Sequence, residues 1–125
     1  MENKAKEKAL ACHSQGYNCA QSVLLALSEQ TGTDPTTAAA VAAGFGGGVG
    51  CREICGAISG SVMAAGFKYG AENKAKVVQA ERELIGAFRE KFGAVRCEEL
   101  KAKRIPCDDL IAFAAEKMAE ILGKD

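Results

Sequence analysis

The chain has 125 residues, a length that fits one domain, and 48% of them are hydrophobic and 26% charged, as in ordinary globular proteins. The formal net charge is zero, so charge gives no reason to expect a nucleic acid or an anionic membrane as partner. The charged start, MENKAKEKAL, lacks the apolar run of a secretory signal. Arg52 and Glu53 interrupt the longest weakly polar stretch before it reaches the roughly 18 apolar residues of a membrane span. We therefore expect one domain over residues 1–125, located in the cytoplasm.

The first part of the chain carries the signals of three helices. The first is expected at residues 3–13. The second is expected at residues 19–30, because Asn18 can cap its first turn. Asp34 and Pro35 then begin a third helix, since aspartate is a good N-cap and proline suits the first turn.

The second part of the chain predicts helices at residues 55–69 and 72–91, with Gly70 ending the first of them. A short helical turn is expected after Cys97, and a last helix at residues 108–122. Strand signals are almost absent, because runs of valine, isoleucine and threonine are short. The sequence therefore predicts an all-α fold, a compact bundle of about five to six helices with a glycine-rich loop before the central helix.

Small residues recur every four positions along that central helix, at Gly56, Gly60 and Ala64. This spacing lets another helix approach closely. A glycine inside a helix costs about 1 kcal/mol relative to alanine, so close packing must offset the cost. The neighbouring helix is expected either in the core of the same chain or in a homodimer formed through this stripe.

The stretch GFGGGVGCREICGAISG, residues 44–60, does not match a nucleotide-binding loop. A dinucleotide fingerprint starting at Gly44 would need glycine where Val49 stands, and no predicted strand precedes it. A P-loop would need Lys-Ser/Thr after Gly50, where the chain has Cys51 and Arg52. We interpret the stretch as a turn that brings backbone and thiols close to a small bound group. The glycines expected to support that group are Gly46, Gly47, Gly48, Gly50 and Gly56.

Six cysteines indicate metal binding or redox chemistry rather than structural bridges, if the compartment is reducing. Four of them fall at expected helix N-termini: Cys19, Cys55, Cys97 and Cys107. The partial positive charge there stabilises a thiolate and can lower the pKa of a cysteine. Both a metal ligand and a redox nucleophile suit this placement. The spacing matches no ferredoxin and contains no C-x-x-C pair. The single histidine, His13, is expected to be a surface or packing residue.

The stretches GYNCAQ, GFGGGVG and CGAISG, followed by Cys97 and Cys107, resemble the family of small redox-active proteins named for a C_GCAxxG_C_C pattern. The resemblance covers about residues 16–107. It implies that the functional cysteines are Cys19, Cys55, Cys97 and Cys107. It also implies an iron–sulfur centre, because a similar domain in some multihaem proteins is associated with one. Cys12 and Cys51 lie outside this set of four, and Cys51 is kept as an additional candidate.

Three kinds of site stay open. The first is an iron–sulfur cluster of [2Fe–2S] or [4Fe–4S] type, used for electron transfer or sensing. The second is a metal-free thiol–disulfide protein that pairs Cys51 with Cys55, about 6 Å apart on one helical turn, and Cys97 with Cys107. The third is a structural zinc site. An electron-transfer protein is favoured over an enzyme that turns over a substrate, and the sequence identifies no redox partner protein. A helical interaction module with inert cysteines is the remaining alternative.

Overall fold

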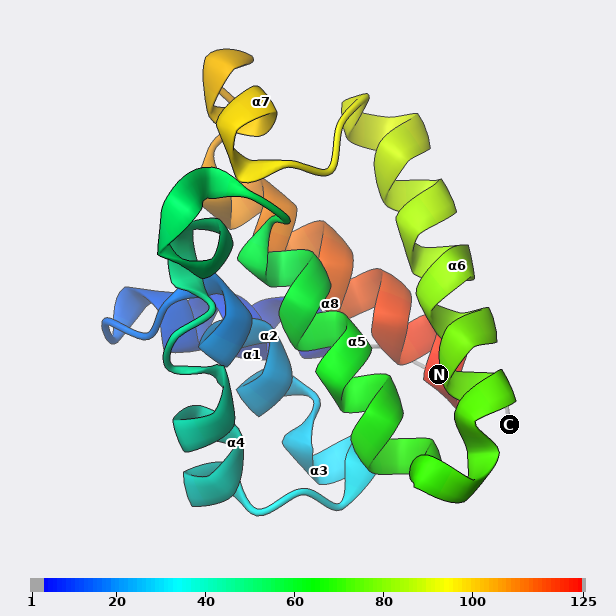
Figure 1. The fold of residues 1–125 in the computed structure, drawn as a ribbon. Helices are drawn as coiled ribbons and strands as arrows, with labels where there is room; N and C mark the ends of the chain where they lie inside the picture. The colour runs from blue at the N-terminus through cyan, green and yellow to red at the C-terminus, as the bar shows by residue number, and fades with distance from the viewer. Residues whose placement is uncertain (1–3, 125) are drawn as a thin grey trace.

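The computed structural model describes residues 4–124, which form a helical bundle (Figure 1). Within this range the backbone has no strand, only an isolated bridge between Ile54 and Arg96, so the all-α prediction is confirmed. The α-helices in chain order are α1 (Ala5–Ser14), α2 (Cys19–Ala26), α3 (Ser28–Thr31), α4 (Pro35–Ala42), α5 (Gly56–Tyr69), α6 (Lys74–Phe92), α7 (Cys97–Ala102) and α8 (Cys107–Gly123). Two short turns, η1 (Gly48–Arg52) and η2 (Ala71–Asn73), complete the described elements.

The expected helix at residues 19–30 is divided at Leu27 into α2 and α3. The Leu27 amide donates to the carbonyls of both Val23 and Leu24, at 3.2 Å each, which tightens the last turn of α2. The hydroxyl of Ser28 donates to the Leu25 carbonyl at 2.7 Å. Because such local side-chain bonds compete with the helical pattern, the chain changes direction here.

Helix α5 runs through the middle of the molecule and packs against α2, α6 and α8 (Figure 1). The core between these helices is built from large apolar side chains that are fully buried, among them Leu24, Ile58, Leu84, Phe88, Ile111 and Met118. The rings of Phe88, Phe92 and Phe113 contact one another between α6 and α8. The bundle therefore has a substantial apolar core, and the buried Cys55 is part of it.

The small-residue stripe of α5 packs inside the chain. Gly56, Gly60 and Ala64 are all buried. A methyl group added at Gly60 would collide with the backbone carbonyl oxygen of Ala20 in α2, which shows how closely α2 and α5 approach. The homodimer expected through this stripe is therefore wrong, because α2 of the same chain already covers it.

The glycine-rich loop turns in the left-handed region before α5. Gly48 and Gly50 have φ values of 63° and 71°, and Val49 between them has a φ of 61°, which is rare for a β-branched residue. A side chain at Gly48 would collide with the backbone of Glu53, and its Cβ would lie 3.0 Å from that of Cys97. The loop thus folds back tightly under the start of α7.

Among residues 4–124, no helix is both long enough and apolar enough to cross a membrane.

Candidate functional site

A cavity of about 210 Å³ opens where the N-termini of α2, α5, α7 and α8 meet. Four thiol side chains line it: Cys19, Cys55, Cys97 and Cys107. Cys19, Cys97 and Cys107 are the first residues of their helices, and Cys55 is the N-cap of α5. The sequence-based prediction that these cysteines stand at helix N-termini is confirmed. Much of the remaining lining is apolar, from Leu100, Ile105 and Leu110.

Asn18 sets the position of Cys19. Its side-chain oxygen accepts a hydrogen bond from the Gln21 amide at 2.8 Å, and the Gln21 side chain accepts one from the Asn18 amide at 3.0 Å, which makes a capping box. The Asn18 side-chain amide also donates to the Ala43 carbonyl at 3.0 Å. Asn18 therefore begins α2 and ties that start to the chain that leads into the glycine-rich loop.

Gly56 makes room for the Cys19 sulfur. A Cβ at this position would lie 2.5 Å from the Cys19 Sγ and 3.0 Å from the Phe45 carbonyl oxygen. Real Cβ atoms do not approach sulfur so closely, so the absence of a side chain lets the starts of α2 and α5 meet. Gly56 also lines the cavity.

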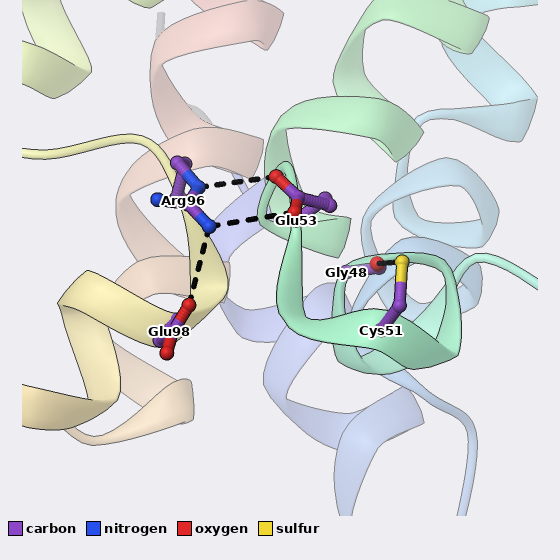
Figure 2. A network of polar contacts seen from close by, with 5 residues as sticks. All are labelled: Gly48, Cys51, Glu53, Arg96 and Glu98. Carbon is purple, nitrogen blue, oxygen red and sulfur yellow. Dashed lines mark hydrogen bonds and ion pairs between the residues drawn. The ribbon is translucent and has the colours of Figure 1, made fainter.

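Backbone pairing between residues 53–55 and 95–97 holds Cys55 and Cys97 at the cavity. The Cys55 amide donates to the Val95 carbonyl at 2.9 Å, and the Cys97 amide donates to the Glu53 carbonyl at 2.6 Å. Figure 2 shows the side chains outside this pairing, where the Arg96 guanidinium reaches the Glu53 carboxylate at 3.1 Å and that of Glu98 at 3.2 Å. Exposed ion pairs contribute little to stability, so the two backbone bonds are the main constraint.

Burial works against ionisation of two cavity thiols, Cys55 and Cys107. It raises the pKa of Cys55 to about 12, and the neighbouring Cys19 and Cys97 also raise it, while hydrogen bonds from the Ala57 and Ile58 amides lower it. Burial also raises the pKa of Cys107, although Lys101 lowers it. The expected lowering of pKa by helix N-termini is therefore outweighed by desolvation at Cys55 and Cys107.

The four cysteine side chains line a cavity that is larger than a single metal ion. Within residues 4–124, no group of three or more histidine, cysteine, aspartate or glutamate side chains is arranged to hold a metal ion. A zinc site needs its sulfur ligands about 2.3 Å from one centre. The cavity is far larger than a single ion, since one water molecule needs only roughly 10–15 Å³. Its shape and thiol lining fit a group larger than one ion better than a preformed zinc site.

The structure separates Cys51 from the other candidates. Cys51 is exposed in η1, and its thiol donates to the Gly48 carbonyl at 3.4 Å (Figure 2). The cavity is not lined by Cys51 or by Cys12, a half-buried residue of α1. No single helical turn joins Cys51 to Cys55, because η1 ends at Arg52 and Ile54 forms the isolated bridge before α5 begins at Gly56. The helical-turn argument for pairing Cys51 with Cys55 was therefore wrong.

The glycines of the loop, like the cysteines, divide into those that line the cavity and those that do not. Of the five glycines expected to support a bound group, Gly47 and Gly56 line the cavity. Gly46 instead packs against Asn18, where an added Cβ would lie 2.7 Å from the Asn18 Cβ. Gly48 packs against the Glu53 backbone, and nothing lies within 4 Å of a Cβ built at Gly50. The role of these three is to shape the turn rather than to face the cavity.

His13, expected from the sequence as a surface or packing residue, also lines the cavity. It lines the cavity from α1, with its side chain 32% exposed, and its Nδ1 lies 2.7 Å from the Asp108 Oδ1. These two residues are 95 positions apart, so no local spacing could reveal the pair. The one available signal was that His13 is the single histidine of the chain and adjoins Cys12.

Searches of curated proteins and of solved structures find no match to this chain. The family model described as "Putative redox-active protein (C_GCAxxG_C_C)" matches residues 17–121. This range contains the four cavity cysteines and the glycine-rich loop, and it leaves Cys12 outside. The match covers most of the chain and confirms the resemblance drawn from the motifs. The chain belongs to the C_GCAxxG_C_C family.

Proposed function

We propose that this protein holds an iron–sulfur cluster in the cavity, with Cys19, Cys55, Cys97 and Cys107 as ligands, for electron transfer or redox sensing. The observation that carries the proposal is that four thiols from the starts of four helices line one cavity. Thiolates are the usual protein ligands of iron–sulfur clusters, and such a cluster supplies one-electron chemistry. A protein with free thiols of this kind suits a reducing compartment such as the cytoplasm.

The raised pKa of the Cys55 thiol supports a site that contains a metal. A thiol whose pKa is about 12, as for Cys55, is almost fully protonated at neutral pH. Thiol–disulfide exchange requires the thiolate, so this group is a poor nucleophile. A metal cation deprotonates a coordinating thiol and offsets the cost of burying its charge. The same burial that hinders metal-free exchange would therefore be compensated by a bound cluster.

Backbone amides at the cavity would support such a group. At the start of α5, the Ala57 and Ile58 amides already hydrogen-bond the Cys55 sulfur. Hydrogen bonds to cluster sulfurs raise the reduction potential, and solvent exposure changes it further. Gly47 and Gly56 leave the backbone accessible because they carry no side chain.

A metal-free dithiol protein is the second candidate, because all four cavity cysteines are free thiols that share one space. In that case the disulfides would form among these four, and Cys51 would stay outside. A cluster absorbs visible light and contains iron and sulfide, whereas a dithiol pair does neither, so the two candidates are readily distinguished.

The test is anaerobic purification followed by a visible spectrum and by iron, sulfide and zinc analysis of one sample, before and after cluster reconstitution. We expect a brown protein with one cluster per chain. Serine substitution of Cys97 should abolish loading, whereas Cys51→Ser, the matched control outside the cavity, should load like the wild type. Colourless protein with stoichiometric zinc, or protein that stays metal-free after reconstitution, would overturn the proposal.

A further inference from the structure

His13 and Cys107 both line the cavity, and Cys107 is exposed whereas Cys55 and Cys97 are buried. Asp108, the residue that follows Cys107, accepts the hydrogen bond from His13. The pair thus joins α1 to the start of α8 and places an imidazole beside the most accessible of the four cavity thiols.

Asp108 determines which nitrogen of His13 is left for the cavity. A carboxylate can only accept, so the Nδ1 of His13, 2.7 Å from the Asp108 Oδ1, carries a proton. In the neutral ring the lone pair is then on Nε2. Asp108 lines a separate groove with Lys6, Leu10 and other residues of α1, α6 and α8, so it holds the imidazole from outside the cavity.

A histidine held in this way has the arrangement of a metal ligand. Histidines that bind metals almost always donate their other ring N–H to a carboxylate or a carbonyl, which fixes the ring and raises its basicity. Among residues 4–124, the His13 Nδ1 bonds Asp108 and no side chain bonds its Nε2. His13 lines the same cavity as the four cysteines and the apolar side chains.

The geometry points to His13 as a second donor for the coordination position that Cys107 serves: when the Cys107 thiol is lost, the Nε2 of His13 takes its place. This inference rests on the proposed function and concerns how the same site tolerates loss of its exposed ligand. Replacing a thiolate by a neutral imidazole makes the site less negative, and histidine ligation raises the reduction potential of an iron–sulfur centre. His13 is the one histidine among the described residues that line the cavity.

The test uses Cys107→Ser and, as matched control, Cys97→Ser. Because His13 is the only histidine, labelling histidine with ¹⁵N marks this ring alone. We expect reconstituted Cys107→Ser to retain at least half of the wild-type iron and to show ¹⁵N hyperfine coupling in the reduced state. Its reduction potential should be higher than that of the wild type. We expect Cys97→Ser to lose the iron.

The double variant Cys107→Ser/His13→Gln should lose the iron as completely as Cys97→Ser does. Circular dichroism verifies that each variant folds, and Cys107→Ala provides a second substitution at the exposed position. Loss of iron from Cys107→Ser and Cys107→Ala while the wild type loads would overturn the inference and leave the proposed function standing. Retention of iron without ¹⁵N coupling would do the same. A wild type that takes up no cluster overturns both.

Discussion

At the scale of single residues, Gly56 matters most for where the Cys19 sulfur lies. In Gly56→Ala the new methyl would lie 2.5 Å from the Cys19 Sγ, so the sulfur or the helix start must move. We expect iron incorporation to fall severalfold, measured as iron per chain after reconstitution.

Gly66→Ala is the matched control for this prediction. Gly66 lies on the same helix, and nothing is within 4 Å of a Cβ built there. This change should leave loading unaltered and stabilise the protein by about 0.5–1 kcal/mol, because alanine suits a helix better than glycine. Equal loading of Gly56→Ala and wild type would show that the close contact with Cys19 has no role.

The Cys55 thiol makes stability depend on pH in the metal-free protein. Its pKa is raised from 9.0 to about 12, so above pH 9 the unfolded chain releases a proton that the folded chain retains. The unfolded state then binds fewer protons, and the free energy of unfolding falls as pH rises toward 12. Between pH 9 and pH 11 this group should contribute a loss of about 2–3 kcal/mol.

Urea unfolding at several pH values checks this prediction. Cys55→Ala should show a shallower decline than the wild type, because the alanine side chain does not titrate. The raised pKa values of Cys12 and Cys107 act in the same direction and remain in both proteins. Parallel declines for the two proteins would mean that Cys55 ionises normally in the folded chain.

At the scale of the elements, the start of α2 depends on Asn18. Asn18→Ala removes the N-cap and the bond to the Ala43 carbonyl, so we expect a loss of about 1–2 kcal/mol in the free energy of unfolding. Asn18→Asp separates the two roles, because it keeps the acceptor for the Gln21 amide and loses the donor to Ala43. Aspartate should therefore retain most of the stability and still lower cluster loading. Full loading of both variants would contradict a role for this cap in placing Cys19.

Helix ends were predictable because local chemistry determines them. Asn18 and Asp34 cap α2 and α4 through their own side chains, and Gly93 ends α6 with a φ of 78°. The break at Leu27 depends on hydrogen bonds of neighbouring residues that no periodic pattern reveals. The left-handed conformation of Val49 was equally hidden, because valine has no intrinsic preference for it.

The site was predictable only in part, because some of its features depend on residues that are far apart in the chain. The cysteines of α2, α5, α7 and α8 could be placed at helix starts from sequence, and those starts do meet. The separation of Cys51 from Cys55 follows from backbone pairing with residues 95–97, which are far away in the chain. The bond between His13 and Asp108 joins the two ends of the chain, and only the tertiary structure brings them together.

At the scale of the whole molecule, most of the core does not line the cavity, although Cys55, Leu100 and Leu110 belong to both. Most of the largest buried side chains come from α2, α5, α6 and α8, so folding does not require a ligand at the cysteines. We expect the metal-free protein to show a helical circular dichroism spectrum and one cooperative thermal transition. Loading should raise the midpoint by several degrees, because the ligand binds only the folded state. A metal-free chain without helical signal would contradict this expectation.

The most direct test of the central claim compares Cys107 with Cys51 by alkylation and peptide mass spectrometry. Both cysteines are exposed, but only Cys107 lines the cavity. In the metal-free protein, iodoacetamide should label both. In anaerobically reconstituted protein, labelling of Cys107 should fall at least tenfold, while labelling of Cys51 stays unchanged. Equal labelling of Cys107 with and without iron, or protection of Cys51 instead, would contradict the account that the cavity thiols hold the cluster.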